Sequence, residues 1–133
     1  MKAQEFDAAL ATRLGADEYG MKQYVMAFLK AGPHRDQDSA TAANLQKAHL
    51  KNIMRMAEEG TLVLAGPFFD DGDIKGIYLF NVKTIEEAQK LTETDPAIKA
   101  GRLAMELHPW YGSAALMEVN RIHKMVEKKS VAD

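Results

Sequence analysis

Hydrophobic residues recur along this chain with two different spacings, and these spacings predict its strands and helices. Residues 22–30 carry apolar groups on both faces, as an interior strand does. Residues 61–69 and 74–82 form two further strands, and the Asp-Gly turn between them predicts a hairpin. Residues 102–108 alternate as a fourth strand, with Ala104, Glu106 and His108 on one face and Leu103, Met105 and Leu107 on the other.

Helical spacing predicts an N-terminal helix over the first fifteen residues, packed as an appendage. A longer helix runs from Ser39, the expected N-cap, to Gly60, the expected stop. Thr84 and Glu87 form a capping box that begins another helix. Ser113 begins the last helix, whose apolar stripe consists of Ala115, Val119, Ile122 and Val126.

The order helix, βαββαβ, helix predicts an α+β fold of ferredoxin-like type, with an antiparallel sheet covered by helices on one face. We expect a helical extension over residues 1–20, the ferredoxin-like domain over residues 21–112 and a C-terminal helix over residues 113–133. The other sheet face then needs cover, because large apolar groups remain to be buried. A homodimer that packs sheet to sheet would bury Tyr24, Met26, Phe28, Tyr78 and Phe80.

Composition narrows the class of protein. The chain has 133 residues, 47% hydrophobic and 27% charged, which suits one globular domain. The 17 basic residues are scattered and the net charge is −2, so we expect no nucleic-acid partner. Acidic residues interrupt the first twenty positions where a signal peptide needs an apolar stretch, which predicts a cytoplasmic protein without a membrane partner. Without cysteine, a thiolate metal site is excluded, and residues 34–39 match no metal-binding loop.

His49 is the main candidate for chemistry. It lies in the middle of an apolar helix face that Ala42, Leu45, Ile53 and Met56 share. Histidine transfers protons near neutral pH, and an aspartate bonded to one ring nitrogen would fix its tautomer. Asp95 is the candidate partner, although Asp before Pro96 is also an N-cap signature. His49 as a satisfied core histidine and Asp95 as a cap remain the alternatives.

A second group of candidates lies in the strands. Glu106 and His108 project from one sheet face and could add to a pocket, or His108 could only bond backbone at the strand end. Trp110 and Tyr78 could wall a site for an aromatic substrate, or belong to a dimer core. We expect substrate contacts from Tyr78, Glu106, His108 and Trp110.

Four short motifs carry a resemblance to the YciI-like (YCII-related) proteins, over about residues 21–112. These are His49-Leu50 in the long helix, Gly66-Pro67 after the second strand, Asp95-Pro96-Ala97, and His108-Pro109-Trp110 at the end of the fourth strand. The resemblance implies a dimeric α+β barrel of ferredoxin-like halves and an active site built from a histidine and an aspartate. Motif match assigns these roles to His49 and Asp95.

The resemblance implies fold more firmly than reaction. The family includes a dehydrochlorinase of a chlorinated hydroxyquinol, and related barrels include muconolactone isomerases. One hypothesis is therefore a lyase, isomerase or dehydrochlorinase-like enzyme that moves a proton on a small cyclic or aromatic substrate without a cofactor or metal. The alternative is a non-catalytic dimeric module that binds a small ligand or a protein, in which His49 and Asp95 serve only structure.

Overall fold

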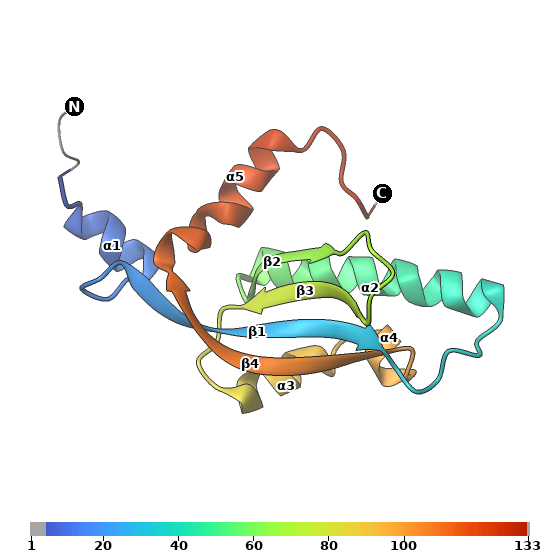
Figure 1. The fold of residues 1–133 in the computed structure, drawn as a ribbon. Helices are drawn as coiled ribbons and strands as arrows, with labels where there is room; N and C mark the ends of the chain where they lie inside the picture. The colour runs from blue at the N-terminus through green and yellow to red at the C-terminus, as the bar shows by residue number, and fades with distance from the viewer. Residues whose placement is uncertain (1–4, 133) are drawn as a thin grey trace.

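A four-stranded antiparallel sheet forms the centre of the protein, whose computed structural model describes residues 5–132 (Figure 1). The strand order is β2-β3-β1-β4, so the two middle strands are flanked by the hairpin partner β2 and by the late strand β4. This arrangement confirms the ferredoxin-like α+β prediction. The strands are β1 (Met21–Ala31), β2 (Leu62–Pro67), β3 (Ile74–Phe80) and β4 (Leu103–Ser113).

Three helices lie on one face of the sheet, namely α2 (Ser39–Glu59), α3 (Ile85–Thr92) and α4 (Pro96–Lys99). Helix α1 (Ala8–Leu14) lies at one end of the molecule, and the predicted helix includes residues 1–4, which lie outside the described part. The chain ends with the 3-10 helix η1 (Ala114–Glu118) and α5 (Val119–Val126). No helix within residues 5–132 is long and apolar enough to cross a membrane.

The main hydrophobic core lies between the sheet and the helices, and it contains two residues expected on the opposite face. Ala27 pairs with Tyr78 and Val25 with Phe80. Residues directly opposite in an antiparallel pair point to the same face, so Tyr78 and Phe80 lie under the helices. Their expected place beside Tyr24, Met26 and Phe28 was wrong. The buried members of this core are Val25, Ala27, Leu29, Met56, Leu62, Tyr78, Phe80 and Ala88.

The other face of the sheet is only partly covered within the chain. Tyr24, Val63 and Leu79 are buried there, and η1 packs Leu116 and Met117 against them. The register of β1 and β4 places Met26, Phe28, Glu106, His108 and Trp110 along the same face. This face therefore retains apolar surface that one chain does not fully bury.

Two boundaries differ from the sequence prediction for physical reasons. Asp38, not Ser39, caps α2, because its carboxylate accepts a 2.7 Å hydrogen bond from the backbone N–H of Thr41. Strand β4 does not end at His108 but continues to Ser113. Pro109 is tolerated inside it because β4 is an edge strand, where a missing N–H breaks no ladder on the open side.

Helix α5 is attached to the rest of the chain mainly through polar groups. Asn120 donates from Nδ2 to the backbone oxygen of Leu62 at 2.8 Å, and Lys124 forms a 2.8 Å ion pair with Glu58. In its predicted apolar stripe Val119 is half-buried, but Ile122 and Val126 are exposed, at 45% and 73%. Within residues 5–132, nothing buries the part of the α5 stripe that Ile122 and Val126 form.

Candidate functional site

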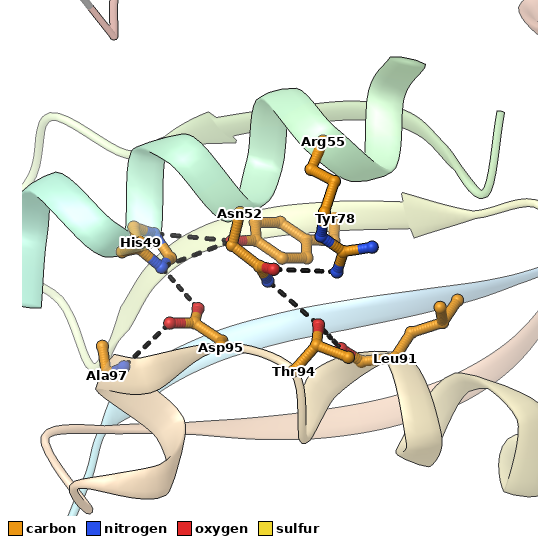
Figure 2. A network of polar contacts seen from close by, with 8 residues as sticks. All are labelled: His49, Asn52, Arg55, Tyr78, Leu91, Thr94, Asp95 and Ala97. Atoms are coloured by element: carbon orange, nitrogen blue, oxygen red, sulfur yellow. Dashed lines mark hydrogen bonds and ion pairs between the residues drawn. The ribbon is translucent and has the colours of Figure 1, made fainter. Parts of the chain in front are cut away.

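His49 and Asp95 meet between the helices and the sheet (Figure 2). His49 comes from the buried side of α2 and is 6% exposed, and Asp95 comes from the turn that precedes α4 and is 1% exposed. The distance from His49 Nδ1 to Asp95 Oδ2 is 2.5 Å. Two residues that are 46 positions apart in the chain thus form a short, buried hydrogen bond.

Asp95 uses its two carboxylate oxygens for two different purposes. Oδ1 accepts a 2.8 Å hydrogen bond from the backbone N–H of Ala97 and so caps α4, while Oδ2 contacts His49. The capping role and the contact with His49 therefore coexist. Since a carboxylate only accepts hydrogen bonds, His49 Nδ1–H is the donor and Nε2 of the neutral ring keeps its lone pair.

Tyr78 from β3 lies beside the His49 ring and is 2% exposed. The two rings are nearly parallel, at 19° and 6.1 Å between centroids. The Tyr78 hydroxyl is 3.4 Å from His49 Nε2 and 3.5 Å from Nδ1, and both distances are long for hydrogen bonds. Burial, and secondarily the nearby charge of Asp95, raise the pKa of the Tyr78 hydroxyl. Tyr78 is therefore a neutral hydrogen-bond donor across the physiological range.

A cavity of about 740 Å³ opens beside His49 and Tyr78. Its walls come from α2, β2, β3 and α5, and this size falls in the range of small-molecule sites. The floor is mainly apolar, with aliphatic side chains that include Leu29, Leu50, Ile53, Leu62, Leu64 and Leu103. The buried His49 side chain thus adjoins a space that suits an apolar ligand.

Charged residues at the cavity are mostly paired with one another. Arg55 Nη1 donates to both carboxylate oxygens of Glu59, at 2.9 Å each. His123 contributes to the cavity wall and lies 3.7 Å from Glu127 Oε1. Lys75 also lines the cavity and donates to the backbone oxygen of Gly72. The cavity lining therefore combines a larger apolar area with a few polar groups that are mostly paired.

The structure does not bring all the candidate residues together. Glu106, His108 and Trp110 lie on the sheet face opposite the helices, and none is among the described residues that line the cavity. Glu106 contacts both Lys30 and His108 at 3.1 Å, and the hydrogen bonds from His108 and Lys30 lower the pKa of its carboxyl. Within one chain these residues form a separate, exposed cluster. Of the four expected substrate contacts, the structure brings only Tyr78 to the His49 cavity.

Asn52 is a buried polar residue at the site that the sequence prediction missed. It follows His49 by three positions on α2 and donates to Thr94, the neighbour of Asp95. Helical spacing places it beside His49, which was the available signal. In residues 5–132, no group of three or more histidine, aspartate or glutamate side chains is arranged to hold a metal ion.

Three comparisons with known proteins gave different results. No curated protein matches the chain. Among solved structures, the chain is similar to 5-chloro-2-hydroxyhydroquinone dehydrochlorinase from Burkholderia phenoliruptrix, in complex with 2,5-dihydroxybenzoquinone. The identity is 20%, the TM-score is 0.48, and the match covers 67% of this chain and 93% of the other. The sequence model of the YCII-related domain matches residues 24–110, well over half of the chain. The chain therefore belongs to the YCII-related domain family.

Proposed function

We propose that this protein is an enzyme of lyase or isomerase type that moves a proton on a small molecule without a cofactor. The observation that carries the proposal is the 2.5 Å contact from Asp95 to His49 Nδ1, beside a cavity that His49 lines. With Nδ1 engaged, Nε2 is the nitrogen available to accept a proton from a ligand.

Each of the three residues has a separate role in this mechanism. His49 Nε2 removes a proton from a carbon next to a carbonyl group, and the electron pair moves to the carbonyl oxygen. Tyr78 donates a hydrogen bond to that oxygen as negative charge develops, which a buried neutral phenol does well. Asp95 holds the His49 tautomer and stabilises the imidazolium that forms.

The same first step supports two outcomes. In an isomerase, His49 returns the proton to another carbon of the substrate. In a lyase, the electron pair expels a leaving group from the neighbouring carbon, and chloride would make the reaction a dehydrochlorination. The mainly apolar cavity of about 740 Å³ favours a cyclic or aromatic substrate in both cases.

The second candidate function is a non-catalytic module that binds a small ligand. The apolar lining of the cavity favours it, since such a space binds an apolar molecule without any chemistry. In that case the His49–Asp95 contact would only join α2 to the start of α4. The two functions differ in whether a bound ligand exchanges its protons.

Deuterium exchange separates the two functions. The protein is incubated in heavy water with a panel of cyclic ketones, lactones and their chlorinated derivatives, and NMR follows the loss of the C–H signals next to the carbonyl group. We expect at least one compound to exchange faster than its buffer rate, and His49→Ala to lower the excess rate by at least about 100-fold. Asn44→Ala, on the exposed face of α2, is the control and should exchange as the wild type does. Binding of a panel member with neither enhanced exchange nor release of a leaving group would favour the binding module.

A further inference from the structure

We propose that Asn52 and Thr94 are positioning residues for the His49–Asp95 pair. The inference rests on the proposed function, because it assigns these two residues the task of keeping the pair in its reactive geometry. Both residues lie outside the reacting atoms, and neither is required to touch a ligand. Figure 2 shows them next to the pair and on the same two segments of the chain.

The location of the two residues supports the proposal. Asn52 is one helical turn after His49 on α2 and is 8% exposed. Thr94 directly precedes Asp95. The hydrogen bond from Asn52 Nδ2 to Thr94 Oγ1, at 3.1 Å, therefore joins the same helix and the same turn as the His49–Asp95 contact does.

The direction of each hydrogen bond in this group is fixed by chemistry. The guanidinium of Arg55 can only donate, and its Nη2 lies 2.9 Å from Asn52 Oδ1. The Asn52 amide must then present its oxygen to Arg55 and its NH₂ group to Thr94. Thr94 accepts at Oγ1 and donates its own proton to the backbone oxygen of Leu91 at 2.6 Å. Each side chain in this hydrogen-bond network thus has one defined orientation.

A second contact one turn away has a mechanical consequence. Core residues such as Met56 hold α2, but with the His49–Asp95 hydrogen bond alone the turn that carries Asp95 could shift relative to α2, and this would change where Nε2 points in the cavity. Two parallel connections, one residue apart on the turn and three apart on the helix, remove that freedom. Reaction rates are sensitive to small displacements of catalytic groups, since about 1 Å of misplacement lowers the rate about 100-fold.

The chain offers a matched control for Thr94. The hydroxyl of Thr92 donates to the backbone oxygen of Gln89 at 2.8 Å, as the hydroxyl of Thr94 donates to that of Leu91. Both residues therefore bond the carbonyl three positions earlier, at the end of α3. Only Thr94 also accepts from Asn52. Thr92→Val removes a hydroxyl group that makes the same kind of backbone contact as that of Thr94, and it leaves the hydrogen bond from Asn52 to Thr94 in place.

The test measures the ring proton on His49 Nδ1 by NMR in protein labelled with nitrogen-15 at histidine. We expect the wild type to show this proton far downfield, with the signal absent in His49→Ala. In Thr94→Val the signal should move upfield and exchange with solvent several-fold faster, up to about tenfold. Thr94→Ser keeps the hydroxyl group and should show the wild-type signal, as should Thr92→Val. Asn52→Leu should reproduce the effect of Thr94→Val.

Different outcomes overturn different claims. If Thr94→Val and Asn52→Leu leave a wild-type signal unchanged, the positioning role is wrong while the His49–Asp95 pair stands. If Thr92→Val shifts the signal as much as Thr94→Val, the effect belongs to the end of α3 in general and the positioning role is again wrong. If the wild type lacks the signal, both the pair and its positioning residues are overturned. Circular dichroism of each variant confirms that the fold is retained.

Discussion

Tyr78 is buried against His49 and has a pKa raised by burial and by the charge of Asp95. A raised pKa means that the folded protein holds the phenol proton more tightly than the unfolded chain does. The corresponding stability is complete below about pH 10, the ordinary phenol pKa, and is lost as pH rises above it. The phenol proton of Tyr78 therefore makes the stability of the fold depend on alkaline pH, and it is the same proton that Tyr78 would share with a substrate.

This coupling can be measured from the pH dependence of unfolding. We expect the free energy of unfolding in urea to fall from about pH 9 to pH 11, and to fall less steeply in Tyr78→Phe. Tyr19→Phe is the control, because Tyr19 is 76% exposed and should follow the wild-type slope. Equal slopes in wild type and Tyr78→Phe would mean that the Tyr78 proton is not held by the fold.

At the scale of residues, the sequence predicted where a residue lies in its element better than which residue it contacts. His49 could be placed on a buried helix face from its spacing, and Asp95 could be recognised as a cap from the proline that follows it. Their 2.5 Å contact spans 46 positions, so only the family resemblance indicated it. Asn52 was missed because a polar residue at the edge of an apolar stripe looks solvent-exposed when its partner, Thr94, lies on another segment.

At the scale of elements, the side chain of Asp95 connects two helices. Its Oδ1 accepts a hydrogen bond from the backbone N–H of Ala97 and so caps α4. Its Oδ2 contacts His49 on the buried face of α2. Asparagine is as good an N-cap as aspartate, so an asparagine at this position keeps the start of α4. Only the group that faces His49 then changes, which separates the cap from the chemistry.

Most elements were predictable because their signals are local. Apolar spacing, the Thr84 cap and Gly60, whose φ is 82°, are each contained in a few residues. The elements that differed depend on neighbours in space. Strand β4 continues past His108 because β1 supplies pairing partners as far as Ser113, and no local pattern encodes that pairing.

At the scale of the whole molecule, the distribution of side chains between the two sheet faces decides what remains exposed. The strand register could not be read from one sequence, so Tyr78 and Phe80 were expected on the wrong face. Even without them, the face opposite the helices carries Met26, Phe28 and Trp110, the last 38% exposed. A homodimer through this face stays a prediction.

The dimer can be tested by light scattering after gel filtration. We expect the mass of two chains for the wild type and of one chain for Trp110→Lys, because the lysine would place a charge in an apolar interface. Val126→Lys is the control, since this residue lies at the end of α5, outside the four strands, and is 73% exposed. A wild-type mass of one chain, or a monomer from Val126→Lys alone, would contradict an interface through the sheet.

The central claim is that Asp95 accepts from His49 Nδ1 and leaves Nε2 free to take a proton. The most direct test is the nitrogen-15 spectrum of the His49 ring at a pH where the ring is neutral, in wild type and Asp95→Asn. We predict the proton on Nδ1 in the wild type. In Asp95→Asn it should move to Nε2, because the amide caps Ala97 with its oxygen and offers an N–H to Nδ1. The free energy of unfolding should stay within about 1 kcal/mol, since the cap is kept. A wild-type proton on Nε2 would contradict the claim.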